Sequence, residues 1–195
     1  MNEGYKKVLA GHRGIDWLEK LDSLLKSKQD DIVRVMKAYE CRERWLQGEL
    51  FLGAPSGMVK VNEVVLWEKE GIDRRGRKRR SQAKVDYASP GLVAEIKLLG
   101  TSHQQKVVED GSWSLKKDFE RLHDSNLRPK GDLHLLIFIL VNEGETNLGK
   151  ACKTFSPPPE IPATELYGFK AQDWKSGDHE LGMVRIWKIE PKGHS

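Results

Sequence analysis

Three residues in one short stretch have the types and spacing that phosphodiester chemistry needs: Asp86, Glu95 and Lys97. Asp86 ends one apolar segment, a Ser-Pro-Gly turn occupies residues 89–91, and Glu95 and Lys97 lie in the apolar segment over 92–99. Side chains alternate between the two faces of a strand, so Glu95 and Lys97 are expected on one face. A hairpin at the turn would return Asp86 toward Glu95. Two carboxylates can hold a divalent cation, and a lysine beside them can orient or help to deprotonate an attacking water.

The surrounding segments predict the elements that position these residues. Apolar residues at helical spacing predict helices over Ile15–Lys26, over about Asp31 to Leu52 and over about Ser114 to His123. Strands are expected over Met58–Trp67, Ala83–Tyr87, Leu92–Leu99, Asp132–Val141, Glu165–Phe169 and Met183–Ile189. The first three strands are expected to form an antiparallel meander. The order of elements predicts an α/β fold with a mixed β-sheet flanked by helices.

This arrangement resembles the PD-(D/E)xK phosphodiesterase superfamily, which has a restriction-endonuclease-like core. The resemblance covers about residues 31–141 and implies that Asp86 is the first metal-binding acid, Glu95 the second and Lys97 the motif lysine. It also implies that the backbone carbonyl of Ile96 completes the metal site. Val85 stands where the name of the motif has proline, which is not a ligand.

The resemblance extends to the helix that precedes the strands. Nucleases of this type often carry a glutamate there that reaches the same metal, and the segment Glu43-Arg44-Trp45-Leu46-Gln47-Gly48-Glu49-Leu50 matches that helix, with Glu49 as the usual active-site acid. Glu43 lies six residues earlier, at a different angle around the helix, and is the alternative. Both glutamates are ordinary surface residues if the helix merely presents a charged face. Some family members also place a glutamine or lysine after the third strand against the substrate phosphate, which makes Gln104 a candidate.

Positive charge is concentrated in one short segment. Six basic residues lie within seven positions: Arg74, Arg75, Arg77, Lys78, Arg79 and Arg80. The whole chain has 33 basic and 29 acidic residues, so without these six it would have 27 basic and 29 acidic residues. A local cluster of this kind suits contacts with DNA phosphates. The alternatives are a solvated loop and a localisation tag.

Length and composition limit the remaining possibilities. A chain of 195 residues is long enough for a single domain, expected over 1–195, with the N-terminal helix and C-terminal strands added to the core. No stretch of about 18 apolar residues occurs, so no membrane-spanning helix is expected. The first residues lack the apolar centre of a signal peptide. Cys41 and Cys152 lack metal-ligand spacing and are expected to be free thiols, so we expect a cytoplasmic protein.

These observations predict a nuclease that requires Mg²⁺ or Mn²⁺ and hydrolyses phosphodiester bonds in DNA. Many enzymes of this fold form homodimers, although no interface pattern is evident here. One alternative is a catalytically inactive nucleic-acid-binding or scaffolding module with the same fold. Another is a structural or regulatory α/β protein in which Lys97 forms only a surface ion pair with Glu95 or Asp86, a contact that contributes about 0–1 kcal/mol.

Overall fold

The computed structural model describes residues 4–12, 14–36, 42–53, 60–61, 65–72, 75–101, 115–125, 132–143, 148, 156–176 and 178–192. The helices are α1 (Gly4–Val8), α2 (Ile15–Ser27), α3 (Gln29–Met36), α4 (Arg42–Leu52) and α6 (Leu115–His123). The strands are β1 (Lys60–Val61), β2 (Val65–Ile72), β3 (Lys78–Lys84), β4 (Tyr87–Ser89), β5 (Leu92–Gly100), β6 (Leu133–Val141), β7 (Ala163–Leu166), β8 (Asp173–Ser176) and β9 (His179–Ile189).

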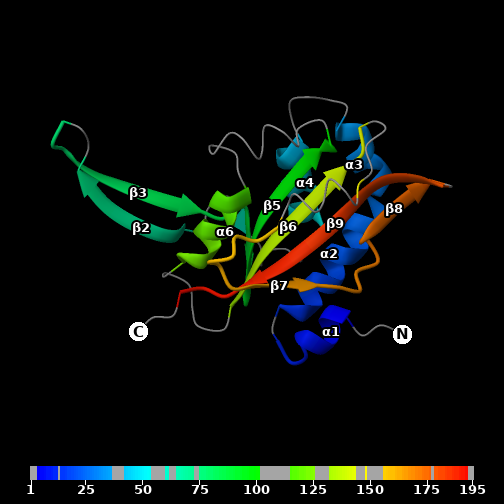
Figure 1. Ribbon diagram of the computed structural model, residues 1–195, viewed down its shortest axis with the longest axis horizontal. Helices are drawn as coiled ribbons and strands as arrows, with labels where there is room; N and C mark the ends of the chain where they lie inside the picture. Colours follow the sequence, from blue (N-terminus) through cyan, green and yellow to red (C-terminus); the bar gives the residue numbers. More distant parts are fainter. Residues whose placement is uncertain are drawn as a thin grey trace.

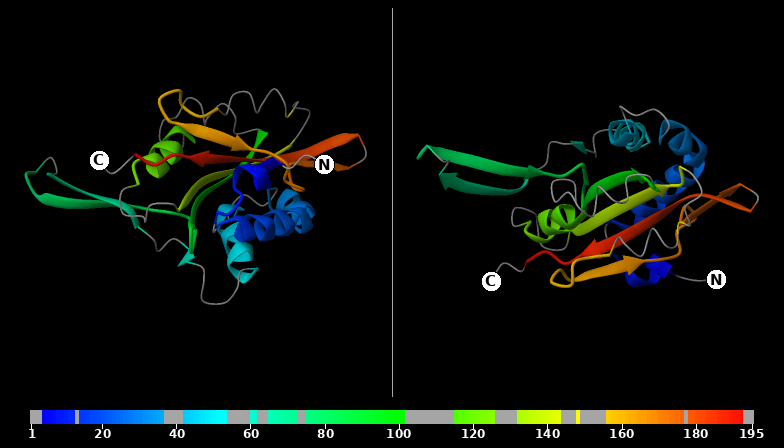
Figure 2. Two further views of the ribbon diagram at one scale, coloured as in Figure 1. Left: turned by 90° about the horizontal axis from the view of Figure 1, so that it is seen from below. Right: turned by 45° about the horizontal axis from the view of Figure 1, so that its top comes forward.

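Seven of these strands form one mixed sheet, which confirms the predicted α/β class (Figure 1). The order is β1-β4-β5-β6-β9-β7, and β8 also pairs with β9. Strands β5 and β6 are parallel, and α6 lies in the connection between them, as a parallel pair requires a crossover. The other pairings are antiparallel. Figure 2 shows α2 and α4 on one side of the sheet and α6 on the other.

Each face of the sheet has its own apolar core, and β5 contributes to both. Leu92, Ala94, Ile96 and Leu98 belong to the cluster that also contains the buried residues of α1 to α4. Val93 belongs to the second cluster, with the apolar residues of α6. The alternation that the sequence predicts for β5 is therefore confirmed, and Glu95 and Lys97 come from the α6 face of the strand.

The hairpin predicted at residues 89–91 is present before β5, with a two-residue loop. Ser89 and Leu92 are paired at its base, which leaves Pro90 and Gly91 as the central residues. Proline suits the first of these positions because its φ is fixed, and Gly91 has a φ of 81°, which side chains other than glycine rarely adopt. The hairpin sets the register that returns the chain from Glu95 to the neighbourhood of Asp86.

Two segments differ from the prediction in how the chain is divided. The predicted strand over Met58–Trp67 contains β1, which pairs with β4, and the start of β2, which pairs with β3 in a separate two-stranded sheet. The predicted strand over Ala83–Tyr87 is likewise split, so that Asp86 lies between β3 and β4. The meander in the main sheet is therefore β1-β4-β5. Alternating apolar residues predict that a segment is extended, but they do not predict its pairing partner.

The helix predicted from Asp31 to Leu52 is two helices in the described residues. Helices α3 and α4 contact each other, and each places apolar residues in the same core cluster, Ile32 and Met36 from α3 and Leu46 and Leu50 from α4. A continuous helix of this length extends about 30 Å in one direction, so it would not pack one half of itself against the other. Residues 37–41, which connect the two helices, lie outside the described residues.

The sequence did not predict α1 or β8, and both pack against the C-terminal part of the chain. The Tyr5 ring in α1 stacks on Phe169 at a centroid distance of 4.2 Å. In α2, the buried carboxylate of Asp22 accepts hydrogen bonds from the backbone N–H groups of Lys170 and Ala171, each at 2.9 Å. The helices in the described residues are too short or too polar to cross a membrane.

Candidate functional site

Where β4 separates from β5, the carboxylates of Asp86 and Glu95 take the place of backbone carbonyls as acceptors of hydrogen bonds from backbone N–H groups. The Asp86 N–H donates to Glu95 Oε2 at 3.0 Å, and the Ile96 N–H donates to Asp86 Oδ2 at 2.9 Å. These bonds fix the orientation of both carboxylates beside each other. The predicted proximity of Asp86 and Glu95 is thus observed.

The edge of β5 beyond Ala94 is covered by side chains. No strand in the described part of the chain pairs with this edge after Ala94. Instead, Asp86 accepts the N–H of Ile96, and Glu43 Oε1 accepts the N–H of Leu98 at 3.5 Å. In an extended strand the N–H and C=O of one residue point to the same edge, so the Ile96 carbonyl points to the edge that carries Asp86.

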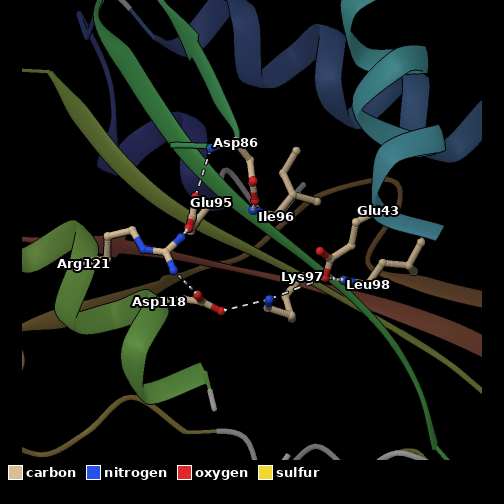
Figure 3. A network of polar contacts seen from close by, with 8 residues as sticks. All are labelled: Glu43, Asp86, Glu95, Ile96, Lys97, Leu98, Asp118 and Arg121. Atoms are coloured by element: carbon tan, nitrogen blue, oxygen red, sulfur yellow. Dashed lines mark hydrogen bonds and ion pairs between the residues drawn. The ribbon is translucent and has the colours of Figure 1, made fainter. Parts of the chain in front are cut away.

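On the α6 face of β5, charged side chains form a line of alternating sign (Figure 3). The Arg121 guanidinium contacts Glu95 Oε1 and lies 3.5 Å from Asp118 Oδ1. The Lys97 ammonium lies 3.3 Å from Asp118 Oδ2 and 3.5 Å from Glu43 Oε1. The line Glu95–Arg121–Asp118–Lys97–Glu43 therefore joins β5, α6 and α4 at a single site.

The acid of α4 that the structure brings to Lys97 is Glu43, the alternative, whereas Glu49, which the resemblance favoured, lies away from this site. The Glu49 carboxylate is 3.1 Å from the ammonium of Lys28, just after the end of α2. Six residues along an α-helix correspond to a rotation of about 120° away from the starting direction. With Glu43 directed at Lys97, Glu49 therefore points elsewhere. Gln47 is one turn after Glu43 and its side chain hydrogen-bonds Asp86.

Burial and neighbouring charges determine the charge states of Asp86 and Lys97. Burial raises the pKa of Asp86, against the opposing effects of the Ile96 N–H, Lys97, Arg121 and Gln47. Burial alone would lower the pKa of Lys97, but Asp118, Glu43 and Asp86 outweigh it, so the pKa of Lys97 is raised. Lys97 is therefore a cation at neutral pH and is suited to holding negative charge or orienting water rather than to accepting a proton.

The pKa of Asp118, a buried acid of the site, is also raised. Its side chain is 6% exposed, and burial raises its pKa to about 6, although Lys97 opposes the shift. Asp86 and Glu43 add negative charge nearby and raise the pKa further. Arg121 faces Asp118 from the same helix.

We expect this shift to appear as a pH dependence of folding stability. An unfolded aspartate has a pKa of about 3.9, so folded Asp118 retains a proton that the unfolded chain releases between about pH 4 and 6. Its contribution to stability is therefore present at low pH and is lost as the pH rises through about 6. Urea unfolding of the wild type and of Asp118→Asn at pH 4.5 and 7.5 measures this effect. The free energy of unfolding of the wild type, relative to the variant, is expected to fall by about 2 kcal/mol over that interval. A pH-independent difference would contradict the assignment.

The donors at the β5 edge fit a divalent cation in chemistry and in charge. Mg²⁺ in proteins is commonly held by one or two carboxylates with several waters, and Asp86 and Glu95 supply two carboxylates beside the carbonyl of Ile96. With all groups ionised, four acids (Glu43, Asp86, Glu95 and Asp118) exceed two bases (Lys97 and Arg121), a net charge of −2 that a divalent cation would balance. No group of three His, Cys, Asp or Glu side chains among the described residues is arranged to hold a metal.

Three residues of the site were not assigned a role from the sequence: Gln47, Asp118 and Arg121. The feature of the sequence that could have identified Asp118 and Arg121 is the position of each residue around the axis of its helix. Asp118 lies on the stripe of α6 that buries Leu115, Phe119 and Leu122, where an aspartate is unexpected unless it has a partner. Arg121 follows Asp118 by three residues, which places the two side chains on one face of the helix.

The described residues of the predicted DNA-contacting segment precede Asp86 by 6 to 11 positions in the chain. Arg75 and Arg77 lie in the connection between β2 and β3, and Lys78, Arg79 and Arg80 begin β3. The basic segment is therefore partly strand rather than entirely loop. Arg74 and Gln104 lie outside the described residues.

Comparison with known proteins adds no relative from which a function could be transferred. No family model matches the chain, and no curated protein or solved structure is significantly similar to it.

Proposed function

We propose that the chain has a restriction-endonuclease-like core and is a nuclease that requires Mg²⁺ or Mn²⁺ to hydrolyse phosphodiester bonds in DNA. The observation that carries the proposal is the arrangement at the β5 edge. Two carboxylates lie beside each other next to the Ile96 carbonyl, and a half-buried, charged lysine comes from the same strand. An acid–acid–lysine set of this kind is what metal-assisted hydrolysis of a phosphodiester needs.

In this proposal each side chain has a distinct role. Asp86 and Glu95, with the Ile96 carbonyl, would hold the cation, which when bound lowers the pKa of water and neutralises charge that develops on the phosphate. Lys97 orients the attacking water and stabilises negative charge on the scissile phosphate. Glu43 and Asp118 fix the Lys97 ammonium between them and keep it protonated. Glu43 and Asp118 are thus positioning residues.

A second candidate, an inactive module that binds DNA without cleaving it, is favoured by one contact. The Arg121 guanidinium pairs with Glu95, whose other carboxylate oxygen accepts the Asp86 N–H. An arginine that remains there permanently would supply the positive charge that a metal otherwise brings. The two candidates differ in whether the protein cleaves DNA.

Nicking of supercoiled plasmid in Mg²⁺ or Mn²⁺ distinguishes them. Wild-type protein is expected to nick, EDTA to abolish nicking, and Asp86→Asn to lower the rate at least about a hundredfold, because even residues that only support metal ligands affect activity by 10–100-fold. Asp30→Asn, an exposed aspartate on α3, serves as the matched control and should retain the wild-type rate. Metal-independent DNA binding without any nicking would support the inactive module instead.

A further inference from the structure

The β2–β3 hairpin, called the arm from here on, is a separate element of the molecule. In the described part of the chain, β2 and β3 pair with each other and not with the main sheet. Figures 1 and 2 show the arm projecting away from the body in every view. Its described side chains from Glu70 to Gln82 are all exposed: Glu70, Ile72, Arg75, Arg77, Lys78, Ser81 and Gln82. A two-stranded hairpin is only marginally stable alone in water, so an arm whose described side chains from Glu70 to Gln82 are all exposed is better explained by an external partner than by the fold.

The tip of the arm combines positive charge with one exposed aliphatic side chain. Arg75, Arg77 and Lys78 are exposed there, and Gly76 takes a left-handed φ of 76° in the turn. Ile72 is paired with Lys78 at the end of the ribbon and is 75% exposed. Guanidinium groups recognise phosphates and enter narrow minor grooves, whereas a single isoleucine is too small an apolar area to hold a membrane surface.

The base of the arm leads directly into the candidate site. Strand β3 ends at Lys84, two residues before Asp86. The six steps from Lys78 to Lys84 extend about 20 Å, since a strand rises about 3.3 Å per residue. At 3.4 Å per base pair, this reach corresponds to about six base pairs of duplex DNA.

From these observations we propose that the tip of the arm enters the minor groove of duplex DNA about six base pairs from the phosphodiester at the site, with Ile72 inserted as a wedge between adjacent bases. The duplex substrate rests on the function proposed above. Apolar wedges that enter from the minor groove partly unstack a base step and kink the duplex. Arg75 and Arg77 supply the flanking phosphate contacts, which determine affinity and salt dependence but not the kink.

The test measures DNA bending and binding in EDTA, with the full chain and a 30-base-pair duplex labelled at both ends for energy transfer. The wild type is expected to bend the duplex by roughly 20–90°. Ile72→Thr keeps a β-branched residue in the strand but removes the apolar tip, and it should bind within about tenfold of the wild type and lose the bend. Ile72→Leu should retain the bend. Leu52→Thr, at a position 78% exposed at the end of α4, is the matched control and should bend as the wild type does.

Salt dependence tests the arginines. Replacing both Arg75 and Arg77 by alanine should lower the slope of log K against log salt concentration by roughly two, while the double variant Lys20→Ala/Lys26→Ala on α2 should leave the slope unchanged. A bend that survives Ile72→Thr would overturn the wedge, and an unchanged slope would overturn the phosphate contacts.

Binding to vesicles containing phosphatidylserine in place of DNA would also overturn the proposal. Bending without plasmid nicking would contradict the nuclease only, and nicking without a bend that depends on Ile72 would contradict the wedge only.

Discussion

Replacing Lys97 by methionine is expected to reduce the rate of plasmid nicking by about a thousandfold. Removal of one preorganised donor from an active site typically costs 10²–10³-fold, and Lys97 is the charged group of β5 that lies between Glu43 and Asp118. Methionine has a similar length and fills the same space without the charge. Because the pKa of Lys97 is raised, we expect no loss of activity from its deprotonation as the pH rises from 7 to 9.

The control for this variant is Lys28→Met, which removes a lysine of the Lys28–Glu49 pair and should leave nicking within about twofold. Removing Lys97 also takes away a positive charge that offsets the buried negative charge of Asp118, so the single variant is expected to have a lower free energy of unfolding. The double variant Lys97→Met/Asp118→Asn removes the charge of Asp118 as well and should recover stability without recovering activity. Wild-type nicking by a folded Lys97→Met protein would refute the role assigned to the lysine.

The second large effect is expected at Glu43, measured against Glu49 on the same helix. Glu43→Gln should lower the nicking rate about a hundredfold, because it removes one of the two carboxylates that hold the Lys97 ammonium. Glu49→Gln removes a similar charge from α4 but only disrupts the partly exposed contact with Lys28, which contributes about 0–1 kcal/mol, so its nicking rate should be close to that of the wild type.

The two variants are matched, because each replaces a glutamate of α4 by glutamine and changes the net charge of the protein by the same amount. Thermal unfolding of both proteins provides the folding control. Equal activity of Glu43→Gln and Glu49→Gln would mean that α4 does not contribute to catalysis. A larger loss of nicking activity in Glu49→Gln than in Glu43→Gln would instead support Glu49, the acid that the sequence alone favoured.

What the sequence predicted well depends on alternation within single elements. Strand β5 was predicted closely because its apolar residues alternate with Glu95 and Lys97, and the Pro90-Gly91 turn fixes its start. Strand β6 was predicted because its nine residues are apolar except for His134. A strand of this composition is expected at the centre of a sheet, where both of its faces are covered. Asp86 was expected near Glu95 because a hairpin at the Ser-Pro-Gly turn over residues 89–91 returns the chain.

What it missed depends on angles and partners that are set only when elements pack. The choice between Glu43 and Glu49 depends on the rotation of α4 about its axis, and the pattern of α4 does not determine that rotation because its apolar and polar residues form no clear stripe. Asp118 and Arg121 join the site because α6 packs across the β5–β6 pair, a contact between segments far apart in the chain. Parts of the arm were predicted as strands of the meander. The residues of a segment can indicate that it is extended, but they do not indicate which strand it pairs with.

The edge of β5 that Asp86 and Glu43 cover has a consequence for solubility. A strand edge with unpaired N–H groups is a template for pairing with another chain, and proteins commonly prevent this with charged side chains at the edge. Here the carboxylates of Asp86 and Glu43 accept the N–H groups of Ile96 and Leu98. Asparagine and glutamine at these positions keep an oxygen that can accept the same hydrogen bonds, whereas alanine uncovers the edge. Alanine variants of the site therefore carry a risk of association between chains that is separate from any loss of catalysis.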